Sequence, residues 1–121
     1  MNCEDLRSEI DTALGRLLSG LKLQLESSRE THGDGCELTY RSPRRLVQFY
    51  SSPRNGETNC LVSDDVAEPA DEQRNWQYVR EAAGWREDWT DEQWLAEPDR
   101  GFRSTRQQLI ELGERLSELE W

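Results

Sequence analysis

Apolar residues near the N-terminus recur at spacings of three and four, which is the pattern of an amphipathic helix. This stripe consists of Leu6, Ile10, Ala13, Leu14, Leu17 and Leu18. We predict a helix from Glu4 to Ser19, ended by Gly20. The spacing then changes to two at Leu21, Leu23 and Leu25. This alternation favours a short strand, although the same leucines also fit a continued helix.

The middle of the chain combines strand-forming residues with turn signals. Residues 32–35 (HGDG) predict a turn, and strands are expected over 37–41 and 45–51 because Pro43 interrupts the β-rich run. Asn55-Gly56 permits positive φ at successive positions, so the strand before it and a strand over 58–63 should form an antiparallel hairpin. Alternation places Val47 and Phe49 on the buried face of this hairpin, and Leu46, Gln48 and Tyr50 on the other.

The second half of the chain has helical patterns. A helix is expected from about Pro69, with Trp76, Val79, Ala82 and Ala83 on its apolar face and Gly84 at its end. Residues 90–93 (TDEQ) have the form of a capping box, which predicts a helical turn before Pro98. The last helix is predicted over 102–120, with Leu109, Leu112, Leu116 and Leu119 on one stripe and Trp121 frayed at its end.

The order of these elements predicts an α+β fold, because the strands cluster in the middle and the helices lie at both ends. We expect one acidic domain over residues 1–121. It should contain a small antiparallel sheet of three to four strands flanked by an N-terminal helix and C-terminal helices.

Charge and tryptophan gather in one segment. Residues 64–99 hold four of the five tryptophans and twelve acidic residues against three arginines, a local charge of −9 out of −10 for the chain. Tryptophan is enriched at interface hot spots, and a dense acidic field attracts basic proteins. The predicted partner-binding residues are Trp85, Glu87, Asp88, Trp89, Asp91, Glu92 and Trp94. For any single tryptophan the alternative is a core role, since the chain has only two phenylalanines.

Charge and cysteine content give expectations about nucleic-acid binding and about the cellular compartment. Direct nucleic-acid binding is not expected at a pI near 4.6. The basic stretch 41–54 offers either a phosphate site or, with more support, arginines that pair with acidic neighbours. The absence of an apolar run and the acidic N-terminus predict a cytoplasmic protein that does not contact a membrane. Three cysteines without a Cys-x-x-Cys motif predict reduced thiols, with Cys60 in the core.

Catalytic chemistry has little support in the sequence. His32 is the only histidine and lies in a glycine-rich loop, which is a poor position for a triad. The carboxylates of residues 64–72 lack the spacing of a calcium loop, and a solvated helix start explains them better. We therefore expect no catalytic residues, no metal and no cofactor.

The runs RRLVQFYSS and TNCLVSDD, a polar helix ending in AAGW and the amphipathic C-terminal helix resemble the actinobacterial TY-Chap domains. These domains are related to YbjN and to the type III secretion chaperone-like fold. The resemblance covers residues 4–120 in element order and is most specific at Val47-Gln48-Phe49 and Gly84-Trp85. It implies a helix-sheet-helix domain that binds proteins and brings no catalytic residues. We expect this chain to depart from the family in having a single domain instead of a tandem, and it carries a tryptophan-rich segment.

These observations favour a non-catalytic domain that neutralises or escorts a basic protein, either as the immunity protein of a bacterial toxin or as a secretion-type chaperone. The alternative is a DNA mimic or regulatory protein that blocks a nucleic-acid-binding target. Loss of tryptophan should abolish the first function, and loss of carboxylates the second. The chain is expected to be a monomer or, if its leucine-striped helices leave apolar surface uncovered, a homodimer.

Overall fold

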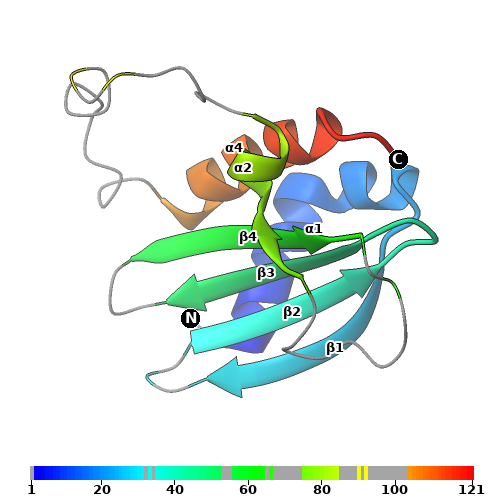
Figure 1. The fold of residues 1–121 in the computed structure, drawn as a ribbon. Coiled ribbons are helices and arrows are strands. Elements are labelled where there is room, and N and C mark those ends of the chain that lie inside the picture. The colour runs from blue at the N-terminus through cyan, green and yellow to red at the C-terminus, as the bar shows by residue number, and fades with distance from the viewer. Residues whose placement is uncertain are drawn as a thin grey trace.

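Five antiparallel strands and the helices around them make up the fold (Figure 1). The computed structural model describes residues 2–31, 33, 35–52, 56–64, 66, 75–84, 90, 92 and 104–121. The elements in chain order are α1 (Cys3–Gly20), β1 (Gln24–Thr31), β2 (Gly35–Arg41), β3 (Leu46–Ser52), β4 (Glu57–Ser63), β5 (Gln77–Tyr78), α2 (Val79–Ala82) and α4 (Thr105–Ser117). The strands lie in the order β1-β2-β3-β4-β5. The α+β class is confirmed, but the sheet has five strands, not three to four.

The helices α1 and α4 cover one face of the sheet (Figure 1). Helix α1 packs on β1 and β2, α4 packs on β4, and the two helices pack on each other. Gly113 allows their close approach, because a Cβ at this position would lie 2.4 Å from Leu14 Cδ2. We call this side the covered face and the opposite side the open face.

The core lies between the covered face and the two helices. Its helical part follows the predicted leucine stripes, so both terminal helices are confirmed. The buried helical residues include Leu6, Ile10, Leu14 and Leu18 of α1 and Leu109, Leu112 and Leu116 of α4. From the sheet, Val47 and Phe49 are fully buried against them.

The predicted hairpin is confirmed. Strand β3 pairs with β4, with Phe49 opposite Cys60 and Val47 opposite Val62, and Gly56 adopts a φ of 60° in the turn. Leu46, which alternation places on the open face, is also completely buried. The expected position of Cys60 in the core is confirmed as well.

Helix α1 ends differently from the prediction, because Gly20 is its last helical residue and not its stop. The left-handed residue is Lys22, with a φ of 59°. The amide of Leu23 donates to the Leu18 carbonyl over 2.9 Å, and the amide of Lys22 donates to Ser19 over 3.1 Å. This is a Schellman ending, in which hydrogen bonds to the last carbonyls compensate for a residue type that rarely adopts positive φ.

Strand β1 also differs, since it runs over Gln24–Thr31 and not over residues 21–25. Most of its residues are exposed, so no apolar alternation marks them in the sequence. Their conformation comes from pairing with β2, which continues through a bulge between Leu25 and Ser27. The strand β5 was missed for a related reason. Residues 77–78 pair with Val62 and Leu61, so among the described residues the expected helix is found only at Val79–Ala82. Its expected start, residues 69–74, lies outside the described residues.

The C-terminal residue Trp121 is held in place, and the expectation of a frayed end is wrong. Its indole N–H donates to the Leu116 carbonyl over 2.8 Å. The guanidinium of Arg45 lies 5.3 Å from the centre of its ring, within the range of a cation–π contact. The indole N–H and the ring of Trp121 therefore both have partners. Neither contact could be predicted from the spacing of apolar residues in the helix.

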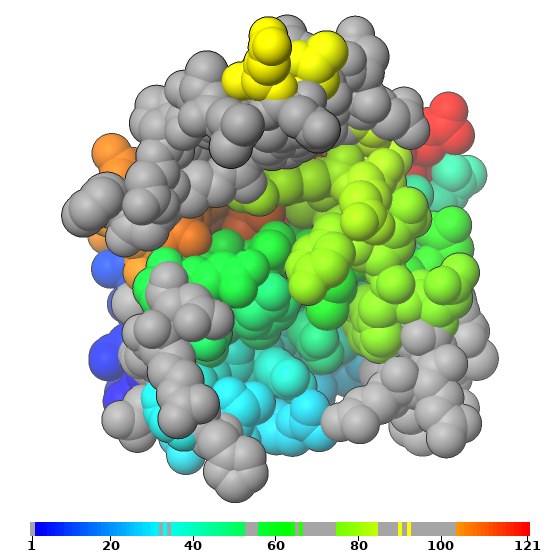
Figure 2. All heavy atoms as spheres, turned by 60° about the vertical axis from the view of Figure 1, so that its left-hand side comes forward, coloured from blue at the N-terminus to red at the C-terminus, as the bar shows by residue number. Residues whose placement is uncertain are grey.

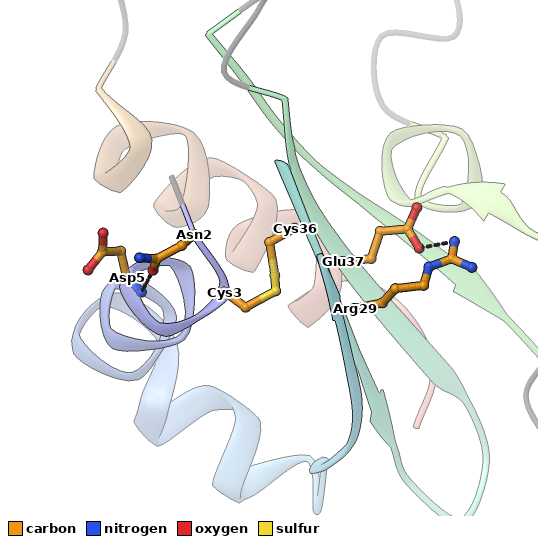
Figure 3. The surroundings of a disulfide bond; sticks show 6 residues. All are labelled: Asn2, Cys3, Asp5, Arg29, Cys36 and Glu37. Carbon is orange, nitrogen blue, oxygen red and sulfur yellow. Dashed lines mark hydrogen bonds and ion pairs between the residues drawn. A yellow bond between two sulfur atoms is a disulfide. The ribbon is translucent and has the colours of Figure 1, made fainter. Parts of the chain in front are cut away.

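Cys3 and Cys36 form a disulfide bond, so the expectation of three reduced thiols is wrong (Figure 3). The bond joins the first turn of α1 to the start of β2 across 33 positions of sequence. Sequence spacing could not show it, because the two cysteines meet only when α1 lies on the sheet. Cys60 is the buried free thiol that makes the number odd. Since disulfides persist in oxidising surroundings, the cysteines give no support to a reducing compartment.

Candidate binding face on the sheet

The predicted partner-binding residues lie almost entirely outside the described residues. This holds for Trp85, Glu87, Asp88, Trp89, Asp91 and Trp94. Glu92 is described, and it is exposed. What the structure defines is how the segment that carries them is attached to the sheet.

The first attachment follows β4. Asp64 Oδ1 lies 2.7 Å from Arg45 Nη1, and the Arg41 guanidinium donates to the Val66 carbonyl. The chain then returns to the same strand, because Tyr78 of β5 pairs with Leu61 of β4. Residues 64 and 78 are thereby both fixed beside the last half of β4.

The second attachment uses α2 and α4. Val79 is fully buried, and Arg80 Nη2 lies 3.7 Å from Glu111 Oε1 on α4. Helix α4 is held to β4 in turn, because the Gln108 amide oxygen accepts from the Thr58 N–H over 2.9 Å and its nitrogen donates to the Gly56 carbonyl over 3.0 Å. Ser104 and Gln107 cap the start of α4 reciprocally. The acidic segment is therefore attached to the β4 side of the sheet at Asp64 and at residues 77–80, and α4, which follows it in the chain, is held to the same strand.

The open face beside these anchors is polar and aromatic. Strand alternation and register bring together Gln48 and Tyr50 of β3, Asn59 and Leu61 of β4, and Tyr78 of β5. Figure 2 shows β4 in green at the surface, with the stretch from β5 to α2 in yellow-green beside it. Tyr78 is 42% exposed and, with Ile110, is one of two exposed large hydrophobic residues among those described. We call Tyr50, Asn59, Leu61 and Tyr78 the aromatic patch.

Hydrogen bonds orient the side chains of the aromatic patch. Glu57 Oε1 accepts from the Tyr50 hydroxyl over 3.1 Å and from Asn59 Nδ2 over 3.0 Å. Burial raises the pKa of Tyr50 well above its usual range, and hydrogen bonds to Tyr78 and Glu57, together with the charge of Glu57, raise it further. The Tyr50 phenol is therefore neutral and acts as a donor. A fixed aromatic ring with a satisfied polar end is well suited to contact another protein.

The rest of the open face carries further polar pairs. Gln48 Nε2 donates to Thr39 Oγ1 over 3.2 Å, and Arg29 pairs with Glu37 (Figure 3). Both contacts join polar side chains of β1, β2 and β3 to one another. The exposed ring of Tyr78 and the carboxylate of Asp64 lie instead beside β4.

The basic stretch 41–54 behaves as the better supported alternative predicted. Arg41 Nε lies 2.6 Å from Glu26 Oε1, and Arg45 pairs with Asp64. Arg44 is exposed, and Arg54 lies outside the described residues. Acidic partners therefore neutralise two of these arginines.

His32, the one candidate for catalytic histidine chemistry, lies outside the described residues. Within those that are described, no group of three or more His, Cys, Asp and Glu residues is arranged to hold a metal ion. Every helix formed by the described parts of the chain is too short or too polar to traverse a lipid bilayer. Comparison of the chain with protein families, with curated proteins and with solved structures finds no match.

Sequence reasoning found part of the aromatic patch and missed the rest. Alternation along β3 predicts Tyr50 of the aromatic patch on the open face. Tyr78 was missed because its position depends on the two-residue strand β5. The signal that could have found it is the run Trp76-Gln77-Tyr78-Val79, which is rich in strand-forming aromatic and β-branched residues.

Proposed function

We propose that this chain is a non-catalytic protein-binding domain that neutralises or escorts a basic protein partner. A toxin that it inhibits as an immunity protein, or a secreted protein that it accompanies as a chaperone, would be such a partner. The resemblance to the TY-Chap domains supports the same class of function and remains a prediction.

One observation carries the proposal: the acidic segment is attached beside the aromatic patch both at its start, Asp64, and at residues 77–80. The anchors are Asp64 on Arg45, β5 on β4, and Arg80 on Glu111. A partner that is attracted by the acidic segment would therefore arrive next to exposed aromatic surface.

The two kinds of residue would do different work. Glu87, Asp88, Asp91 and Glu92 would attract the partner over long range and so raise the association rate. Trp85, Trp89 and Trp94 would supply short-range contact energy, with Tyr78 as an additional anchor, and so lower the dissociation rate.

The experiment measures association with the basic protein encoded beside this chain's gene, because toxins and their inhibitors need matched expression. We expect the association rate to fall at least about tenfold between low and high salt. Replacing the four acidic residues by their amides should lower the rate at low salt. Replacing the most important tryptophan by alanine should weaken binding by about 2 kcal/mol or more through faster dissociation.

Two controls make the result specific. Tyr78→Ala should weaken binding, whereas Ile110→Ala should not, although Ile110 is similarly exposed, at 47% against 42%. An unrelated basic protein such as lysozyme should show the salt dependence without the tryptophan effect. If amide substitutions abolish binding and no tryptophan substitution matters, the DNA-mimic alternative replaces the proposal. If neither set matters, the acidic segment is not the binding surface.

A further inference from the structure

The two edges of the sheet differ in how their backbone groups are occupied. At β4, side chains take the place of a neighbouring strand. The Gln108 amide oxygen accepts from the Thr58 N–H over 2.9 Å, and Asn59 Oδ1 accepts from the Cys60 N–H over 2.9 Å. The last part of β4 pairs with β5. The N–H groups of Thr58 and Cys60 are therefore already bound and do not offer a pairing site to another strand.

Strand β1 forms the opposite edge of the sheet (Figure 1). It is eight residues long, and most of its residues are exposed. Its bulge lies near one end, and the run from Ser27 to Thr31 pairs regularly with β2. Natural sheets commonly protect such an edge with lysine or proline, and β1 (QLESSRET) contains neither. An edge of this kind is a template for a further strand.

The hairpin between β2 and β3 fixes which backbone groups of β1 point outward. The Ser42 N–H donates to the Arg45 carbonyl over 2.9 Å, so it points toward β3. In an antiparallel sheet the bonding direction alternates from one residue to the next. Followed along β2 and across its register with β1, this alternation directs Arg29 toward β2 and directs Ser28 and Glu30 away from it. Ser28 and Glu30 form no hydrogen bond with a described residue in that outward direction.

The side chains of β1 on the open face are complementary to those of a second β1. Ion pairs with β2 place both Arg29 and Glu26 on this face. If two copies of β1 run antiparallel with Ser28 opposite Ser28, Arg29 of one copy lies opposite Ser27 of the other, beside the bulge that carries Glu26. Opposite charges are then neighbours twice, once for each copy. A pairing centred on Arg29 would instead set two arginines directly opposite each other, which is destabilising.

The covered side of β1 is complementary in the same register. Leu25 and Glu30 lie opposite core residues of β2, so both side chains are on the covered side. With the bulge counted as one position, Glu30 faces Leu25 of the second copy. Leu25 lines a hollow of about 490 Å³ that is also lined by Arg7, Lys22 and Asp11, a net charge of one positive unit. Glu30, Arg7 and Lys22 are exposed and form no ion pair with a described residue of their own chain.

We propose that this chain forms a symmetric homodimer in which the two β1 strands pair antiparallel about Ser28. The two five-stranded sheets then become one continuous sheet. Arg29 pairs with Glu26 of the second copy and Glu30 pairs with Lys22, so the same surface serves on both copies, as a two-fold interface requires. The β4–β5 edge with the aromatic patch stays free on each copy. The dimer is therefore independent of the proposed basic partner.

The test is sedimentation equilibrium of the intact protein, combined with amide hydrogen exchange. One pair of edge strands buries less surface than a standard protein interface, so we expect a dissociation constant on the order of 100 µM. The amides of Ser28 and Glu30 should be protected at a protein concentration of about 1 mM and should exchange freely at about 10 µM. The Arg29 amide, which is bonded to β2, should be protected at both concentrations.

A charge exchange tests the register. Glu30→Lys and Lys22→Glu should each weaken the homodimer at least about fivefold, because both contacts between the copies then join like charges. An equimolar mixture of the two variants should restore the wild-type affinity, since each contact of the mixed dimer joins opposite charges. Both residues are exposed and have no ion pair within the described chain, so the fold should tolerate the changes.

A backbone substitution tests the strand pairing itself. Ser28→Pro removes an N–H that β2 does not use, so it should abolish dimerisation and leave the protein folded. Ser28→Ala is the matched control, because it removes the hydroxyl and keeps the N–H. Its dimer should be as stable as that of the wild type. Thermal unfolding shows that each variant is folded.

Three results would overturn the proposal. The first is a protein that remains monomeric up to about 1 mM. The second is a dimer that forms without protection of Ser28 and Glu30, or that persists in a folded Ser28→Pro variant, because its interface would lie elsewhere. The third is a mixture of Glu30→Lys and Lys22→Glu that associates no better than either variant alone, which would exclude the pairing about Ser28.

Discussion

The two faces of the sheet are formed by the same strands but differ in the burial and polarity of their side chains. On β3, Val47 and Phe49 are fully buried against α1 and α4, whereas their neighbours Gln48 and Tyr50 are half-buried on the open face. The covered face is apolar and gains its stability from packing. The open face satisfies its polar groups pairwise, as in the contacts of Tyr50 and Asn59 with Glu57. Apolar packing is therefore concentrated on the covered face, and on the open face the exposed ring of Tyr78 is available for contact with a partner.

The comparison is tested most strongly by paired substitutions on β3. Phe49→Ala should lower the free energy of unfolding by about 3–5 kcal/mol, because it leaves a cavity at the centre of the core. Gln48→Ala should cost at most about 1 kcal/mol, since it removes one hydrogen bond on the open face. Urea unfolding of both variants provides the measurement. Equal losses would show that the open face is as important for stability as the covered one.

The disulfide should have the next largest effect. Reduction of the Cys3–Cys36 bond should lower the free energy of unfolding by about 2–4 kcal/mol, because it releases a loop of 33 residues in the unfolded chain. Thermal unfolding with and without dithiothreitol measures the loss. A Cys3→Ser/Cys36→Ser variant should be insensitive to the reductant, which separates this bond from any effect on Cys60. A wild-type midpoint that does not respond to reduction would contradict the prediction.

Alkaline pH should lower the free energy of unfolding because the Tyr40 hydroxyl of the covered face ionises more readily in the unfolded chain. Its pKa is about 12 in the folded protein and about 10 when the chain unfolds, so the unfolded chain loses the proton first. Ionisation of Tyr40 does not affect stability below about pH 10, and as the pH rises from about 10 to 12 the free energy of unfolding falls by on the order of 2 kcal/mol. Tyr40→Phe should lose stability less steeply over this range. Identical slopes for the two proteins would show that Tyr40 is not shielded from solvent.

The smallest predicted effect is a gain at the end of α1. Lys22→Gly should stabilise the protein by about 0.5–1 kcal/mol, because glycine adopts the positive φ of this position without steric cost. Lys22→Ala retains that cost and serves as the control. If both variants unfold at the same denaturant concentration, the positive φ of residue 22 does not measurably destabilise the protein.

The elements that could be predicted are those whose sequence pattern is contained within a short, continuous stretch of the chain. The leucine stripes gave α1 and α4, and Asn55-Gly56 between two alternating runs gave the β3–β4 hairpin. What was missed depends on contacts between distant segments. The pairing of β5 with β4, the disulfide and the contact of Trp121 with Arg45 are of this kind. None of them leaves a periodic pattern in the sequence.

The same distinction applies to the candidate site. The charge and tryptophan content of residues 64–99 predicts a binding segment, and alternation along β3 predicts Tyr50 on the open face. The anchors that connect the two are an ion pair, a short strand and a helix contact, which join residues far apart in the chain. Sequence reasoning could therefore name residues suited to binding, but not the edge of the sheet at which they are attached.

The Cys3–Cys36 bond also has a consequence for the order of events during synthesis. Residues 3–36 contain all of α1 and β1, and they leave the ribosome before β3 and β4 do. The bond can therefore close a loop around the helix and the edge strand before Cys60 emerges. When that thiol emerges, both of its potential partners are already joined to each other, and folding buries it completely. Early closure of the N-terminal loop would thus protect a chain with three cysteines from mispairing.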